Sequence, residues 1–272
     1  MERKNISKSY QAYIKSPYRS IKHNTYFSVY DELFLKYRNK KIVFVEIGVL
    51  GGGSLFMWRK FFGNKARIIG VDMNPNARKW KDYGFEIIIG NQSDEKFWKK
   101  FISDIGPIDI VLDDGGHTYD QQIVTTEMLL ENIKDGGILV VEDTHTSYMS
   151  GFGPKRYSFI EYTKNMIDLI NNRFSKFNRK KSEKRVWSLR IFESIVAFSV
   201  NKRATKLISK PTVNSGEDDG ARDFRHKDNT YINTLGALNK VMKYVPGYKL
   251  LNKFLNNIAV NHKFSSKKFF DN

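Results

Sequence analysis

Segments with the pattern of buried strands alternate with segments of helical spacing from residue 41 to residue 141, and this alternation limits the fold more than any other feature of the sequence. Short apolar runs end at Ile47, Val71, Ile89, Asp113 and Val141, at intervals of roughly 25 residues. Such alternation is typical of an α/β protein whose parallel sheet is covered by helices on both faces. We therefore expect a doubly wound, Rossmann-like sheet.

Two further strands are predicted downstream of this alternation. Residues 186–200 alternate in polarity and are rich in β-branched side chains on either side of Glu193-Ser194, which favours two strands joined by a tight reversal. They would complete a seven-stranded, mostly parallel sheet with one antiparallel member. Helical spacing predicts the covering helices at residues 26–37, 55–62, 96–102, 125–133 and 159–174.

Positive charge is concentrated in the second half of the chain. Residues 151–272 hold 25 of the 46 Lys and Arg residues but 10 of the 29 Asp and Glu residues, so +15 of the net charge of +17 lies there. This is consistent with phosphorylated substrates, anionic lipid surfaces or nucleic acid and does not choose among them. We expect an N-terminal segment and helix over residues 1–40 that serves as a lid, an α/β domain over residues 41–202, and a basic, partly helical extension over residues 203–272.

The chain contains no cysteine. Disulfides, thiolate metal sites and thiol nucleophiles are therefore excluded, and the composition fits a cytoplasmic protein. No run approaches the roughly 18 apolar residues of a membrane span, and residues 1–22 lack the apolar core of a signal peptide. We expect a soluble, cytoplasmic protein.

A glycine-rich turn follows the first predicted strand. Glycines let the backbone pass close to a ligand, and the helix that follows offers free N–H groups. The dinucleotide fingerprint needs glycine at its third position, where this chain has Leu50. An acid before the turn can hold the amino-acid end of S-adenosylmethionine, whereas it would repel a pyrophosphate. We therefore favour S-adenosylmethionine as the cofactor, held by Glu46, Gly48, Gly51 and Ser54.

Polar residues at the ends of the next two strands extend this candidate cofactor site. Asp72 lies about twenty residues past the glycine turn, where an acid can accept both ribose hydroxyls. Gln92 and Ser93 follow the third strand and are expected to border the adenine. The alternative is that Asp72 caps the next helix and that Ser93 or Asp94 caps the helix after the third strand.

Four carboxylates and an imidazole follow two strands that we expect to be neighbours. Asp113, Asp114 and His117 end the segment 108–117, and Glu142 and Asp143 follow the strand 137–141. Such carboxylates repel one another unless a proton or a cation neutralises them, and an oxygen cluster suits Mg²⁺ or another hard divalent cation. Asp113 is assigned to the cofactor side of this cluster. The alternative is that these acids cap helices and that His117 is a hydrogen-bonded turn residue.

The glycine turn, Asp72 and the acidic segments together resemble class I S-adenosylmethionine-dependent methyltransferases. More narrowly, residues 22–202 resemble the metal-dependent sugar O-methyltransferases of macrolide biosynthesis, of the mycinamicin and tylosin type, and the related cephalosporin-hydroxylase-like group. The specific part is the Asp-Asp-Gly-x-His segment, followed 28 residues after Asp114 by Glu-Asp.

This resemblance implies roles for four residues. It implies that Asp114, Glu142 and Asp143 hold the metal and that His117 is the general base. A bound Mg²⁺ lowers the pKa of a sugar hydroxyl, and a neutral imidazole can take its proton near neutral pH.

We therefore expect an O-methyltransferase of a sugar hydroxyl, on a nucleotide-linked, surface-polysaccharide (capsule) or natural-product sugar. The basic charge of the chain predicts an anionic acceptor. The alternatives are an RNA methyltransferase, a methyltransferase of a small phosphorylated non-sugar acceptor, or a non-enzymatic adaptor. No specific nucleic acid is expected as a partner, because the chain lacks an Asn/Asp-Pro-Pro-Tyr segment and a thiol. We also expect a homo-oligomer and peripheral membrane contact through residues 203–272.

Overall fold

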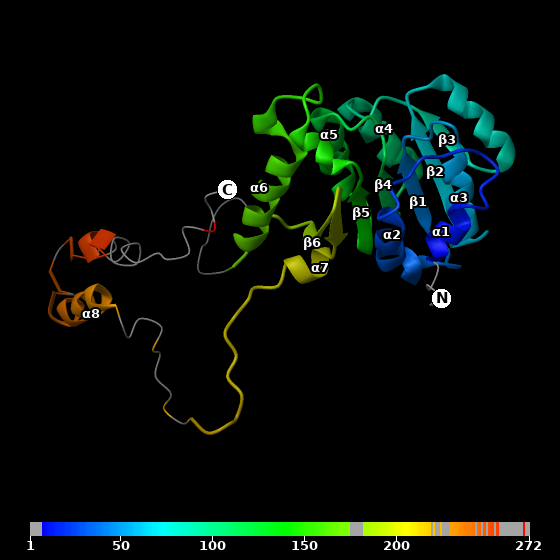
Figure 1. The fold of residues 1–272 in the computed structure, drawn as a ribbon. Helices are drawn as coiled ribbons and strands as arrows, with labels where there is room; N and C mark the ends of the chain where they lie inside the picture. The colour runs from blue at the N-terminus through cyan, green and yellow to red at the C-terminus, as the bar shows by residue number, and fades with distance from the viewer. Residues whose placement is uncertain are drawn as a thin grey trace, which may run out of the picture. The chain divides into compact units, whose positions relative to one another are not determined.

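The computed structural model of the chain forms one seven-stranded sheet from the described residues, with the order β3-β2-β1-β4-β5-β7-β6 (Figure 1). The first five strands in the sequence pair in parallel, and the seventh is antiparallel to both of its neighbours. The predicted α/β fold with one antiparallel member is therefore confirmed. The strands are β1 (Val43–Ile47), β2 (Arg67–Asp72), β3 (Glu86–Ile89), β4 (Ile108–Asp113), β5 (Ile133–Val141), β6 (Val186–Phe192) and β7 (Ile195–Val200).

The structure describes most of the first 218 residues and shorter stretches of the rest. The described residues are 7–174, 182–218, 220, 224, 229–242, 244–245, 247–248, 250–252, 254–255 and 269.

Helices cover both faces of the sheet (Figure 1). Successive side chains of a strand point to opposite faces, so Phe44 packs in the core on one side and Val45 in the core on the other. The first core is formed with α1 (Lys8–Tyr13), α2 (Tyr26–Phe34), α3 (Gly53–Phe62) and the 3₁₀ helix η2 (Pro75–Tyr83). The second is formed with α4 (Glu95–Ile105), α5 (Tyr119–Leu130) and α6 (Phe159–Asn171).

Helix α5 begins earlier than the predicted 125–133. The Thr118 hydroxyl accepts a hydrogen bond from the Gln121 backbone N–H, and the Gln121 side chain accepts one from the Thr118 backbone N–H. This capping box starts the helix ahead of its apolar run. Ile133, which apolar spacing assigned to the helix, instead opens β5. Helices α1 and η2 were not predicted.

The chain divides into two compact units, Met1–Pro211 and Thr212–Asn272. The short helix α7 (Lys202–Thr205) belongs to the first unit, and α8 (Thr230–Met242) lies in the predicted extension. Residues 175–181 and many residues of the predicted extension after position 242 lie outside the described residues. None of the helices that the structure describes has the length and apolar character needed to cross a membrane. Short 3₁₀ helices lie at Leu35–Tyr37 (η1), Thr144–Tyr148 (η3) and Lys155–Tyr157 (η4).

Residues 14–25, which we call the strap, connect α1 to α2 without regular secondary structure. The Ser16 hydroxyl donates a hydrogen bond to the Gly53 carbonyl at 2.8 Å, and the Tyr18 ring packs on Trp80 with centroids 4.6 Å apart. A Cβ atom on Gly53 would lie 2.4 Å from the Tyr18 carbonyl oxygen. The strap therefore lies directly against the glycine turn, and glycine at position 53 allows this approach.

Gly48 requires glycine because of its backbone conformation and because of its close approach to the loop after β4. Comparison with Gly136, which shares only the first property, separates the two effects. Its φ is +87°, and an added Cβ would lie 2.0 Å from the Asp114 carbonyl oxygen, whereas Gly136 has φ +85° and open space around the same position. We expect Gly136→Ala to lower the free energy of unfolding by about 1–2 kcal/mol through backbone strain. Gly48→Ala should lower it by roughly a further 1–3 kcal/mol, because the backbone of the neighbouring loop must move.

Urea denaturation of both variants measures this difference. Equal midpoints for the two variants would mean that the β1–α3 turn moves away from Asp114 at no cost.

Candidate active site

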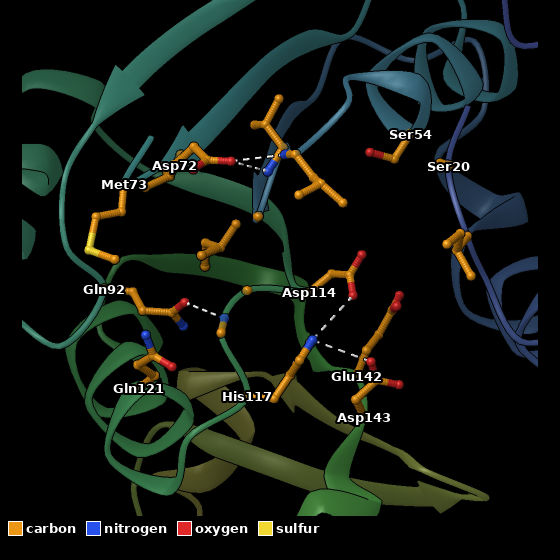
Figure 2. Close-up of a pocket in the computed structure, with 18 of the residues that line it drawn as sticks. Ser20, Ser54, Asp72, Met73, Gln92, Asp114, His117, Gln121, Glu142 and Asp143 are labelled. Atoms are coloured by element: carbon orange, nitrogen blue, oxygen red, sulfur yellow. Dashed lines mark hydrogen bonds and ion pairs between the residues drawn. The ribbon is translucent and has the colours of Figure 1, made fainter. Parts of the chain in front are cut away.

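A cavity of about 470 Å³ opens at the carboxyl ends of β1, β2, β4 and β5 (Figure 2). Ligands of open α/β sheets bind at this edge, and the volume is in the range of small-molecule sites. Most predicted site residues line it. They are Gly48, Gly51, Ser54, Asp72, Gln92, Asp114, His117, Glu142 and Asp143.

Three predicted cofactor residues, Glu46, Ser93 and Asp113, are not among the lining residues. Glu46 is fully buried beneath the glycine turn, where it accepts hydrogen bonds at 2.9 Å from the Ser54 hydroxyl and the Trp58 indole N–H. Both of its oxygens therefore have a hydrogen-bond partner behind the pocket wall. Burial raises the pKa of Glu46 to about 7, although the charge of Lys22 and the two hydrogen bonds act to lower it.

Asp72 supports the glycine turn. Its Oδ2 accepts hydrogen bonds from the backbone N–H groups of Val49 and Leu50, each at 2.9 Å, and its Oδ1 accepts one from Asn74 N–H at 2.8 Å. The dashed lines above the pocket in Figure 2 mark the first two bonds. The proposed capping of η2 belongs to Asn74, whose side chain accepts from Asn76 N–H. Asp72 therefore lines the pocket and fixes the turn at once.

Gln92 connects the end of β3 to the loop after β4. Its Nε2 donates to Asp113 Oδ1 at 3.1 Å, and its Oε1 accepts from the Gly116 backbone N–H at 2.9 Å. Asp113 is buried, and burial raises its pKa to about 7 despite these hydrogen bonds. Ser93 donates its backbone N–H to Asn91, and Asp94 caps α4. Of Gln92, Ser93, Asp94 and Asp113, only Gln92 lines the pocket.

His117 faces the acids of the neighbouring strand end. Its Nε2 lies 3.3 Å from Asp143 Oδ2 and 4.0 Å from Asp114 Oδ1, as the dashed lines in Figure 2 show. His117 and Asp143 both adopt left-handed backbone conformations, with φ of +58° and +53°. One donor atom from each of Asp114, His117 and Asp143 lies within 4.8 Å of the other two, close enough to surround a metal ion. His117 Nδ1 is buried and has no hydrogen-bond partner among the described residues.

Glu142 lies deeper than Asp143. Its Oε1 accepts a hydrogen bond from the Tyr30 hydroxyl at 2.5 Å, and its Oε2 accepts one from Lys22 Nζ at 2.8 Å. Lys22 Nζ also lies 2.5 Å from Asp114 Oδ2. Burial alone would lower the pKa of Lys22, but the charges of Asp114 and Glu142 outweigh it and hold the pKa well above its ordinary value. The three predicted metal ligands therefore line one pocket, with an ammonium group between two of them.

Comparison with known proteins identifies the fold and its relatives. A family model described as a methyltransferase domain matches residues 45–144. An 8-demethyl-8-alpha-L-rhamnosyl tetracenomycin-C 2'-O-methyltransferase of Streptomyces olivaceus is 35% identical over 47% of this chain and 35% of that protein. The mycinamicin VI 2''-O-methyltransferase of Micromonospora griseorubida is 36% identical over 46% of this chain and 32% of that protein.

A solved structure agrees over a longer stretch. The MycE methyltransferase of the mycinamycin pathway, in complex with Mg and SAH, matches with a TM-score of 0.66 and 26% identity, over 79% of this chain and 58% of that chain. The chain has the fold of class I methyltransferases and is similar in sequence to macrolide sugar O-methyltransferases. It spans about a third of the length of the curated relatives it matches.

The sequence did not indicate three residues of this pocket. Lys22 bridges Asp114 and Glu142, and the hydroxyls of Tyr26 and Tyr30 donate to Asp143 and Glu142 at 2.5 Å each. Tyrosine rings at helical spacing are expected to pack in the core, and both rings do lie on the buried face of α2. Their spacing of one helical turn was the available signal, since it aims both hydroxyls in one direction.

The donor set fits both groups that the related structure contains. The acids Asp114, Glu142 and Asp143 line one pocket, and the ammonium of Lys22 stands between Asp114 and Glu142 as a positive charge. The donor atoms that lie within 4.8 Å of one another belong to Asp114, Asp143 and His117, and Glu142 is outside this group. The glycine turn, Asp72 and Gln92 border the remaining cavity, which is large enough for a cofactor.

The buried Glu46 predicts a pH-dependent difference in stability. Its pKa rises from 4.5 in the unfolded chain to about 7 in the folded protein, so the unfolded chain releases the proton first as pH rises. The stability that protonated Glu46 contributes is fully present below pH 4.5 and is lost as pH rises to about 7. Glu46→Gln lacks this loss. The free energy of unfolding of the wild type minus that of the variant should therefore fall by up to about 1.4 kcal/mol per pH unit in this window.

Urea denaturation at a series of pH values from 4.5 to above 7 measures the difference. A difference that does not change with pH would place the Glu46 carboxyl in a solvated environment.

Proposed function

We propose that the chain transfers a methyl group from S-adenosylmethionine to a sugar hydroxyl, with a divalent metal ion. The main observation in support of this proposal is the position of His117. Its Nε2 lies 3.3 Å from Asp143, and its side chain lines the same pocket as the glycine turn and Asp72. An imidazole beside a carboxylate at the ligand-binding edge is suited to take a proton from a hydroxyl. Residues 41–202 are proposed as the catalytic domain, with residues 1–40 as its lid.

The cofactor is proposed to lie over the glycine turn. Gly48 and Gly51 leave room for close approach, Asp72 offers lone pairs for ribose hydroxyls, and Gln92 borders the far wall. Ser54 lines the pocket and carries a hydrogen bond to Glu46. Glu46 and Asp113 are then supports behind the pocket wall, and Ser93 stands outside it. The MycE complex with SAH supports the choice of cofactor.

Asp114, Glu142 and Asp143 are proposed to hold the metal ion. When bound, a hard divalent cation would lower the pKa of a coordinated hydroxyl and offset the charge of the acids. The MycE complex with Mg supports this assignment. Tyr26 fixes Asp143 and Tyr30 fixes Glu142 through hydroxyl hydrogen bonds, so α2 holds these two acids in place.

His117 is proposed to accept the hydroxyl proton at Nε2. Asp143 Oδ2 beside that atom stabilises the imidazolium that results, because opposite charges at this distance attract strongly in a partly buried site. The hydroxyl oxygen then attacks the methyl carbon of the sulfonium donor, and the C–S bond breaks. The protein contributes mainly orientation and charge neutralisation to this step.

The acceptor class is proposed from the relatives, which act on sugars of tetracenomycin and mycinamicin. A structure of MycE with mycinamycin VI, also at a TM-score of 0.66, adds support for a sugar-bearing natural product. The comparisons give no support to a capsule polysaccharide. A nucleotide-linked or otherwise anionic sugar, a homo-oligomer and peripheral membrane contact stay predictions.

The metal requirement is tested by transfer of a labelled methyl group to a panel of glycosylated natural products and nucleotide-linked sugars. EDTA should abolish transfer and added Mg²⁺ should restore it. Asp114→Asn should lower the rate by about 10²-fold or more, because a ligand to the cation is lost. Asp104→Asn removes an exposed acid on α4 and is the control. Full transfer in EDTA would remove the metal from the mechanism.

The role of His117 is tested by His117→Ala. We expect kcat to fall by about 10²-fold or more, because the proton acceptor is lost. Affinity for S-adenosylmethionine, measured by calorimetry, should stay nearly unchanged, since the glycine turn and Asp72 are intact. Added imidazole should restore part of the rate. A variant as active as the wild type would place the base elsewhere.

A further inference from the structure

Lys22 is a lysine whose charged end is buried among carboxylates. Its side chain is 2% exposed, and its Nζ lies 2.5 Å from Asp114 Oδ2 and 2.8 Å from Glu142 Oε2. An ammonium group out of water is unfavourable unless opposite charges and hydrogen bonds compensate. The two carboxylates supply that compensation, and in return Lys22 neutralises part of their charge.

The ammonium uses the oxygens that a metal ion held by the same residues would need. The Tyr30 hydroxyl occupies the other oxygen of Glu142 at 2.5 Å, so neither oxygen of this side chain is without a hydrogen bond. Mg²⁺ binds oxygen at about 2.0–2.1 Å, which is shorter than either distance from Lys22 Nζ. A metal ion held by Asp114 and Glu142 would therefore compete with the ammonium group for the same carboxylates.

Lys22 belongs to the strap, and the strap is seated on the cofactor side of the pocket. Ser16 bonds to the Gly53 carbonyl at 2.8 Å, and residues 19–23 line the cavity. Helix α1, which precedes the strap, is held to α2 by Asp31, which accepts the backbone N–H groups of Lys8 at 2.7 Å and Ser9 at 2.9 Å. The strap is thus anchored at both ends. Lys22 can therefore leave the carboxylates only if the strap itself changes conformation.

We propose that Lys22 is an internal cation that holds Asp114 and Glu142 together before the metal ion arrives, and that the metal expels it and so loosens the strap from the pocket. This inference rests on the proposed metal site at Asp114, Glu142 and Asp143. Expulsion breaks a buried ion pair, so part of the intrinsic affinity for the metal is spent on it. Metal binding thereby exposes the pocket wall formed by residues 19–23.

The first test is a titration of the full chain with Mn²⁺ alone, followed by the electron paramagnetic resonance signal of free Mn²⁺. Lys22→Met should bind Mn²⁺ about 10-fold more tightly or better than the wild type, because the competing cation is gone. Lys15→Met removes an exposed lysine of the same strap and should bind like the wild type. Circular dichroism checks that each variant is folded.

The second test uses the wild type and does not depend on a folded Lys22 variant. Trypsin cleavage after Lys15, Arg19 and Lys22 should become several-fold faster at saturating Mn²⁺, and Asp114→Asn should not show this increase. Equal or weaker Mn²⁺ binding by Lys22→Met, or cleavage that Mn²⁺ does not change, would overturn the proposal and leave the proposed function standing. An absence of Mn²⁺ binding by the wild type and by Lys22→Met would overturn the metal site as well.

Discussion

The parallel pairing of β4 with β5 is the constraint on which the site depends. The Glu142 backbone N–H donates to the Asp113 carbonyl at 2.9 Å, so the two strands end side by side. Each strand continues directly into acids. Asp114, Glu142 and Asp143 are therefore brought into one partly buried volume, where like charges repel strongly. The groups around these acids reduce this repulsion.

Most of the groups that reduce this repulsion come from the first 30 residues of the chain. Lys22 supplies a positive charge, Tyr26 and Tyr30 supply hydroxyl donors, and the strap between α1 and α2 covers the glycine turn. The N-terminal segment therefore serves two purposes. It buries apolar rings against the sheet, and it completes the polar shell of the pocket.

The sequence predicted the sheet well because strand patterns and intervals are local properties. It also predicted which strand ends carry the pocket, since parallel strands place their carboxyl ends at one edge. It did not predict Lys22, because the lysine and Glu142 are 120 positions apart and no spacing rule connects them. The position of Glu46 differed from expectation for a similar reason. Helix α3 brings the Ser54 hydroxyl and the Trp58 indole N–H to the Glu46 carboxylate, and these donors hold it behind the pocket wall.

His117 and Asp143 must each satisfy a requirement of the backbone and a requirement of the side chain. Each is a non-glycine residue in a left-handed backbone conformation after a strand, and their side chains are in direct contact, with His117 Nε2 3.3 Å from Asp143 Oδ2. Aspartate and histidine tolerate this conformation better than most residues, and β-branched residues tolerate it poorly. The range of side chains that either position can accept is therefore restricted by the backbone before chemistry is considered. Asparagine tolerates the left-handed conformation at both positions and carries no charge. Substitution by asparagine therefore removes the ionisable group and keeps the backbone conformation.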